Sequence, residues 1–192
     1  NKDELARAYG NMGIIHRARG EYEEAARFVE RQMATAVEIG DKRRMAGAHL
    51  NFAGIAMGKG DLEEGMRHFE KSLRIAEEIR DKGGVGHALA GVGLIQVLRA
   101  EYEQAMPCLK RAAQIAMEVS DRWLLGSCLG ATGVLHYSQG DYGESKDCLA
   151  RSLEIFEEGG IMDGILDVSH YLCRLYLTMG DGASARAVAD RA

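Results

Sequence analysis

Proline is almost absent from this chain, and long apolar runs are missing altogether. Pro107 is the only proline among the 192 residues of the sequence, whereas loop-rich and low-complexity chains contain many prolines. No stretch approaches the roughly 18 consecutive apolar residues of a membrane-spanning helix, and no signal-peptide pattern opens the chain. The 24 glycines must therefore sit within or between regular elements rather than in long loops.

An excess of positive charge is also missing. The chain carries 24 Lys and Arg against 29 Asp and Glu, which gives a formal net charge of −5. Proteins that follow a nucleic-acid backbone or an anionic membrane surface do so through clustered positive charge. We therefore expect neither nucleic acid nor a membrane as the partner.

The four cysteines show no metal-binding or redox pattern. Cys108, Cys128, Cys148 and Cys173 form no C-x-x-C pair and have no histidine at zinc-finger spacing. Small, buried, reduced thiols are typical of cytoplasmic proteins, so we predict a cytoplasmic location with no disulfide and no metal. Thiol titration under denaturing, non-reducing conditions should return four free cysteines, and a lower count would contradict the prediction.

A turn marker recurs every 40 residues without slippage. It begins at Glu21, Asp61, Glu101, Asp141 and Asp181. A second marker, at Gly40, Arg80 and Ser120, lies 20 residues out of phase. The sequence therefore predicts one domain of five repeats, over residues 1–40, 41–80, 81–120, 121–160 and 161–192, with the last helix truncated. Because the chain starts and stops in mid-pattern, we expect it to be a fragment of a longer protein.

Each marker is a signal that one helix ends and the next begins. Glycine can adopt the left-handed conformation that closes a helix, and the acidic residue after it can cap the next one. Between markers the apolar residues recur at helical spacing, and no alternating strand pattern is present. We predict an all-α chain with helices near 3–19, 21–39, 42–59, 61–79, 83–99, 101–119, 122–139, 141–158, 162–179 and from 181 onward.

Two repeat positions carry only small side chains. The first is occupied by Gly13, Ala53, Gly93, Gly133 and Cys173, and the second by Ala25, Gly65, Ala105, Ser145 and Ala185. Small residues on facing helices let two backbones approach closely. We therefore expect the two helices of each hairpin to cross at these positions.

The small residues, the acidic turn and a large apolar residue four positions later (Val29, Phe69, Leu109 and Leu149) resemble the tetratricopeptide repeat. That repeat usually has 34 residues and ends in proline, whereas this one has 40. The longer form is similar to the repeats of kinesin light chains, of maltose-regulator-type transcription activators and of bacterial peptide-pheromone receptors. The resemblance implies a right-handed superhelical solenoid of antiparallel helix pairs.

Signatures of catalysis and cofactor binding are weak. The segment 54–60 resembles a phosphate loop but has one spacer residue too few and Gly60 where Ser or Thr would hold magnesium. His49, His68, His87 and His170 are expected to lie apart, with no His or Cys four residues along the same helix. We predict no enzyme, no catalytic residue, no cofactor and no metal site.

The resemblance implies a concave groove lined by one face of the first helices. Asn11 and Asn51 occupy a position where related peptide-binding proteins carry a row of asparagines, but the row lapses at Gly91, Ala131 and Tyr171. The apolar middle of the groove is either covered by tighter winding or a neighbouring copy, or is a partner site. The predicted groove residues are Arg7, Asn11, Ile14, Arg17, Leu50, Asn51, Met57, Leu94, Val97, Leu98, Val134, Tyr137 and Arg174.

Taken together, these patterns predict a scaffold module within a larger cytoplasmic signalling or regulatory protein. Its groove would bind a protein or a peptide segment, and its apolar ends could join two copies into a homo-oligomer. The alternative is a small-molecule effector-sensing domain of a transcription activator or a signalling ATPase.

Overall fold

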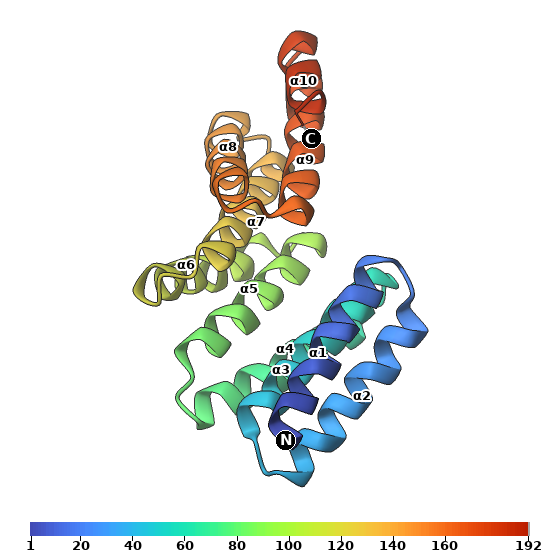
Figure 1. The fold of residues 1–192 in the computed structure, drawn as a ribbon. Coiled ribbons are helices and arrows are strands. Elements are labelled where there is room, and N and C mark those ends of the chain that lie inside the picture. The colour runs from blue at the N-terminus through green and yellow to red at the C-terminus, as the bar shows by residue number, and fades with distance from the viewer. Residues whose placement is uncertain (192) are drawn as a thin grey trace. The chain divides into compact units, whose positions relative to one another are not determined.

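The computed structural model describes residues 1–191, without the side chain of Asp163. All regular secondary structure in this part of the chain is α-helical, which confirms the predicted fold class. The helices follow one another in the order drawn in Figure 1: α1 Lys2–Ala18, α2 Tyr22–Glu38, α3 Lys42–Gly58, α4 Leu62–Glu78, α5 Lys82–Leu98, α6 Tyr102–Glu118, α7 Arg122–Gln139, α8 Tyr142–Gly159, α9 Met162–Thr178 and α10 Gly182–Ala189.

The helices divide between two compact units. Unit 1 comprises Asn1–Ile95 and unit 2 comprises Gln96–Ala192, so α5 begins in the first and ends in the second. In unit 1, α1 packs on α2 and α3 on α4, while α3 also lies against α1 and α2. In unit 2, α7 packs on α8 and α9 on α10, while α7 lies against α6 and α9 against α8. Each unit is thus a stack of helix hairpins, and one solenoid over all five repeats stays a prediction.

The turns fix the helix ends close to where the sequence predicts them. Glycine has a positive φ at Gly20, Gly40, Gly60, Gly140, Gly160 and Gly180. Arg80, Ala100 and Ser120 adopt the same left-handed conformation, with φ of 55°, 59° and 56°. The hairpin geometry therefore imposes the conformation even where the residue has a Cβ, at a cost that glycine avoids.

Only part of the predicted helix capping is present. Asp41, Asp61, Asp121 and Asp181 each accept a hydrogen bond from the amide three residues later, with distances of 2.9–3.0 Å. Glu21, Glu101 and Asp141 make no such side-chain bond. A glutamate is one methylene longer than an aspartate and fits the cap position less well, whereas nothing in the structure explains Asp141.

The small-residue positions are the places where the two helices of a hairpin approach each other. A Cβ built on Gly13 would lie 2.7 Å from Val29 Cγ2, and one on Gly133 would lie 2.6 Å from Leu149 Cγ. The Ser145 hydroxyl donates a 2.8 Å hydrogen bond to the Gly133 carbonyl across the same crossing. Side chains at these positions would push the helices apart, because interiors are packed without spare volume.

The predicted cysteine environment is only partly observed. Cys128 is buried, and burial raises the pKa of its thiol to about 12. Cys108, Cys148 and Cys173 are half-buried. In the part of the chain that the structure describes, no helix is both long and apolar enough to cross a membrane.

Candidate functional site

The predicted site residues of unit 1 lie on α1, α3 and the unit 1 part of α5. Arg7, Asn11 and Ile14 are exposed on α1, and Arg17 on the same helix is half-buried. Leu50, Asn51, Met57 and Leu94 are half-buried on α3 and α5. Because α1 and α3 lie side by side, the residues of these two helices form one surface, which we call the first-helix face of unit 1.

A buried glutamine orients one of the two asparagines on this face. Asn51 Nδ2 donates a 2.9 Å hydrogen bond to Oε1 of Gln32, whose side chain comes from α2 and is only 6% exposed. Gly10 makes room for it, since a Cβ there would lie 2.9 Å from Gln32 Nε2. With its amide nitrogen engaged, Asn51 keeps its carbonyl oxygen as an acceptor.

Sequence reasoning did not find Gln32, although a signal was present. The equivalent positions in the next three repeats hold Ser72, Ala112 and Ser152, all of them small and fully buried. Gln32 has a long amide side chain at a position where the next three repeats carry small residues, so the first repeat departs locally from the repeat pattern. Such a departure requires a hydrogen-bond partner, because a buried amide without one is costly.

Arg17 lies across the backbone of the next first helix. A Cβ built on Gly54 would be 3.2 Å from Arg17 Cδ and 3.3 Å from its Nε. The glycine on α3 thus leaves room for the arginine from α1. The first-helix face of unit 1 therefore combines an oriented amide, a second amide at Asn11 and a guanidinium, next to the exposed Ile14.

In unit 2 the predicted residues separate into buried and exposed ones. Val97 and Val134 are only 4% and 8% exposed, so they belong to the apolar interior and offer little area to a partner. Leu98 and Arg174 are exposed and Tyr137 is half-buried. The Arg174 guanidinium lies 5.6 Å from the centre of the Tyr137 ring, and the Tyr137 hydroxyl lies 3.2 Å from Thr178 Oγ1.

Two histidines that were expected to lie apart are in direct contact. His49 on α3 and His68 on α4 have their Nδ1 atoms 3.0 Å apart, and His68 Nε2 lies 2.9 Å from Glu64 Oε1. Burial, together with the neighbouring His68 and Lys71, lowers the pKa of His49 to about 4. Burial is also the main cause that lowers the pKa of His68, against the opposing effect of Glu64. Both rings are therefore neutral at pH 7 and share a hydrogen bond.

This pair predicts a loss of stability in mild acid. The folded pKa of His49 is about 4, below the ordinary 6.5, so the unfolded chain binds more protons between these values. The part of the free energy of unfolding that depends on neutral His49 is fully present above pH 6.5 and is lost as the pH falls towards 4. Urea unfolding at pH 5 and pH 7 should show the difference.

The matched control is the double variant His49→Tyr with His68→Phe, which copies the residues of the first repeat. There Tyr9 and Phe28 pack with ring centres 6.4 Å apart. We expect the double variant to have a smaller difference in stability between pH 5 and pH 7. An unchanged difference would show that other groups titrate in this range.

His16 and His136 hold the same repeat position but make different polar contacts. His16 stacks on Phe28 with ring centres 5.0 Å apart, and its Nδ1 lies 2.5 Å from Glu21 Oε2. His136 Nδ1 is 3.7 Å from Asp141 Oδ2, too far for a hydrogen bond. Among the described residues, no group of three or more His, Cys, Asp or Glu side chains could hold a metal ion.

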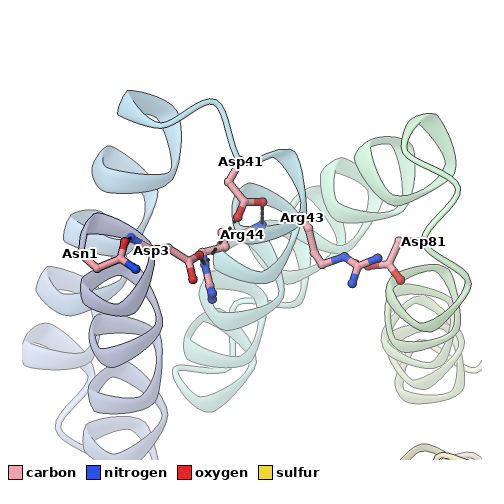
Figure 2. A network of polar contacts seen from close by, with 6 residues as sticks. All are labelled: Asn1, Asp3, Asp41, Arg43, Arg44 and Asp81. Carbon is pink, nitrogen blue, oxygen red and sulfur yellow. Dashed lines mark hydrogen bonds and ion pairs between the residues drawn. The ribbon is translucent and has the colours of Figure 1, made fainter.

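Charged side chains join the starts of α1, α3 and α5 along one edge of unit 1. Arg44 Nε lies 2.5 Å from Asp3 Oδ1 and 3.6 Å from Asp41 Oδ2, and Arg43 Nε lies 3.1 Å from Asp81 Oδ2 (Figure 2). The Arg44 guanidinium lowers the pKa of Asp3 by a hydrogen bond. The network connects successive hairpins and lies apart from the asparagines of the first-helix face.

Structural comparison places this fold among known helical solenoids. A Rap protein complexed with Competence and Sporulation Factor has a TM-score of 0.84 at 17% identity, over 95% of this chain and 51% of that one. A kinesin light chain of Podosopora anserina with TPR-like repeats has a TM-score of 0.63 at 13% identity, over 99% and 93%. A signal transduction ATPase with a tetratricopeptide repeat sensor, from Pyrococcus horikoshii, has a TM-score of 0.66 at 16% identity, over 100% and 30%.

These similarities establish the fold, and the chain spans only about half the length of the Rap protein. No curated protein matches its sequence. Family models described as tetratricopeptide repeat match residues 8–43, 44–118 and 168–191, together more than half of the chain. The repeats, the helix hairpins and these matches lead to one conclusion: the chain belongs to the tetratricopeptide repeat family.

Proposed function

We propose that the chain is a peptide-binding module and that the first-helix face of unit 1 holds an extended peptide. The observation that carries the proposal is the Asn51 amide, which the buried Gln32 fixes at 2.9 Å. A surface asparagine that serves only solubility needs no such support, whereas a binding site gains from groups held in one orientation. The carbonyl oxygen of Asn51 would accept a hydrogen bond from a peptide N–H.

The charges and apolar side chains of this face define the peptide further. Arg7 and Arg17 are two cations on α1, so an acidic residue in the peptide would be favoured there. Ile14 and Met57 on this face, and Leu94 on α5, offer apolar contact for the peptide's side chains. We therefore propose a ligand that alternates acidic and apolar residues, as an extended strand can present them.

Exposed and half-buried residues of unit 2 support a second contact of the same kind. Leu98, Tyr137 and Arg174 combine an aliphatic side chain, an aromatic ring and a guanidinium, which are frequent anchors in protein interfaces. The Rap structure, whose fold is similar, is a complex with Competence and Sporulation Factor, which supports a binding role for such helix hairpins. We propose that the module acts within a larger cytoplasmic signalling or regulatory protein, and we assign it no reaction.

A selection experiment tests the proposal. Peptides would be selected from a random phage-displayed library on the chain, and their affinities measured by fluorescence anisotropy. We expect the selected peptides to compete with one another and to carry acidic residues. Because each asparagine supplies backbone hydrogen bonds, Asn11→Ala with Asn51→Ala should weaken binding about tenfold or more.

The matched control is Arg27→Ala, which removes an exposed side chain of α2 that pairs with Glu24 in the same helix. Its binding should equal that of the unaltered chain. If the asparagine variant binds the selected peptides as tightly as the control, the first-helix face is not the site. If no peptide is selected but small metabolites raise the unfolding temperature, the effector-sensor alternative takes its place.

A further inference from the structure

The second hairpin carries two histidines, His49 and His68, at positions where no other repeat has one. In the first, third and fourth repeats the same two positions hold Tyr9 and Phe28, Leu89 and Cys108, and Leu129 and Cys148. Packing of the hairpin therefore does not require imidazole here, and two half-buried polar rings are costly without hydrogen-bond partners. The histidine pair is a specific feature of this hairpin and not of the repeat.

Glu64 determines where the protons of the two rings lie. A hydrogen bond from Arg67 lowers the pKa of Glu64, so its carboxylate is ionised and can only accept hydrogen bonds. His68 Nε2 lies 2.9 Å from Glu64 Oε1 and therefore carries the proton of its ring. His68 Nδ1 is left with a lone pair, and it faces His49 Nδ1 at 3.0 Å. His49 thus donates its Nδ1–H to His68 Nδ1.

The separation of the two Nδ1 atoms also matches two ligands of one metal ion. Bonds between a metal ion and imidazole are about 2.0–2.1 Å long, so nitrogens 3.0 Å apart correspond to an N–metal–N angle of about 94°. This is close to the right angle between neighbouring ligands in octahedral or square-planar coordination. A tetrahedral ion such as Zn²⁺ would need the nitrogens about 3.3–3.4 Å apart. Ni²⁺ and Cu²⁺ accept imidazole in right-angled geometries.

The surroundings of the pair have the features of a metal site. A metal-bound histidine usually donates its other ring N–H to a carboxylate, which fixes the ring and makes it a stronger ligand, and Glu64 already accepts this hydrogen bond from His68. Both histidines lie on helices, α3 and α4, which hold side chains more precisely than loops do. Glu64 and His68 also line a pocket of about 340 Å³, through which an ion can approach from solvent.

The charges around the pair act in two directions. Burial, followed by the charges of His68 and Lys71, lowers the pKa of His49 to about 4, so the ring is neutral at pH 7 and no bound proton competes with a metal ion. The positive charge of Lys71 would also repel that ion, whereas the negative charge of Glu64 would attract it. The site therefore predicts opposite effects for the loss of these two charges.

We propose that His49 and His68 bind a divalent transition-metal ion, Ni²⁺ or Cu²⁺, through their two Nδ1 atoms in neighbouring, right-angled positions. On binding, the hydrogen bond between the rings breaks and the proton of His49 moves from Nδ1 to Nε2, so neither ring changes its charge. Water completes the coordination, because no group of three or more such side chains in the described part of the chain could hold a metal ion. The sequence pointed to no metal site because it has no such pair within one helix, whereas this pair joins two helices.

The test is a calorimetric titration of the chain with Ni²⁺ at pH 7, followed by the same titration with Zn²⁺. We expect one tightly bound Ni²⁺ per chain and a weaker affinity for Zn²⁺. His49→Tyr with His68→Phe, which copies the first repeat, should weaken Ni²⁺ binding about tenfold or more. Glu64→Ala should weaken it about tenfold, and Lys71→Gln should strengthen it about twofold. Because Ni²⁺ is paramagnetic, it should broaden the amide signals around His49 and His68 first.

His16→Tyr is the matched control. His16 also lies beside a carboxylate, with its Nδ1 2.5 Å from Glu21 Oε2, but its ring stacks on Phe28 and not on a second histidine. Tyrosine holds the same position in the fifth repeat, as Tyr176, so the variant should fold and bind Ni²⁺ as the unaltered chain does. Circular dichroism verifies that each variant is helical. Equal Ni²⁺ affinities of the double variant and the unaltered chain, or tighter binding of Zn²⁺ than of Ni²⁺, would overturn the proposal.

Discussion

Replacing Gly133 by leucine is expected to destabilise unit 2 by about 1–3 kcal/mol, with overpacking as the cause. A Cβ at this position would lie 2.6 Å from Leu149 Cγ and 3.2 Å from the Leu149 backbone nitrogen. The side chain of Leu149 is fully buried and cannot turn into solvent, and the backbone of α8 cannot move without breaking the Ser145–Gly133 hydrogen bond. Urea unfolding followed by circular dichroism measures the loss.

Gly143→Ala is the control for this prediction. Gly143 also lies in a helix, but a Cβ there meets nothing within 4 Å. Alanine at an exposed helical site should stabilise the chain by about 0.5–1 kcal/mol relative to glycine. If Gly133→Leu unfolds at the same urea concentration as the unaltered chain, Gly133 does not mark the crossing of α7 and α8. By the same reasoning Gly93→Leu should also be destabilising, because Gly93 holds the equivalent repeat position and is buried.

Leu94→Glu is expected to abolish binding of the selected peptides, with a loss of affinity of about a hundredfold or more. Leu94 is half-buried on α5, so a bound peptide would cut a glutamate there off from water, which is costly for a charged group. The carboxylate would also repel the acidic residues that we propose for the peptide. Fluorescence anisotropy gives the affinity, and far-ultraviolet circular dichroism verifies that the helices remain.

The control alters the exposed face of α8 by Glu154→Lys with Glu158→Lys. It changes the charge by more than Leu94→Glu does. The ion pair of Glu158 with Arg122 that it removes is exposed, so the contribution of that pair to stability is small. Ile14→Glu offers a second test of the site, because an exposed residue can be changed with little risk to folding. If both groove variants bind normally while the α8 variant does not, the second-helix surface is the functional one.

The repeat pattern predicted the helices nearly to the residue. The predicted helix at 42–59 is α3 Lys42–Gly58, and the one at 122–139 is α7 Arg122–Gln139. Such accuracy is possible because the turn, the cap and the apolar period are local features of the chain. The left-handed residue of the turn was less predictable, since Ala100 adopts it without being glycine.

The candidate site was less accessible to sequence reasoning. Asn11, Ile14 and Asn51 were found because their repeat position marks one face of the first helices. The contact between Asn51 and Gln32 was missed, because it joins two helices through side chains that no other repeat shares. Val97 and Val134 were placed in the groove by position, but their burial depends on the helices packed around them.

The sequence by itself therefore determined the helix boundaries, the crossing glycines Gly13 and Gly133 and the family, because each of these depends on residues close together in the chain or on the strict period of 40. Only the tertiary structure decided which of two equivalent residues meets solvent. Ile15 and Ile55 are the same residue type at the same repeat position, yet Ile15 is exposed and Ile55 is buried. His49 and His68 are 19 residues apart in the sequence, yet their rings are in contact. The physical reason is that burial and side-chain contact belong to the packing between helices, and a repeat period specifies where a side chain points on its own helix but not what lies opposite.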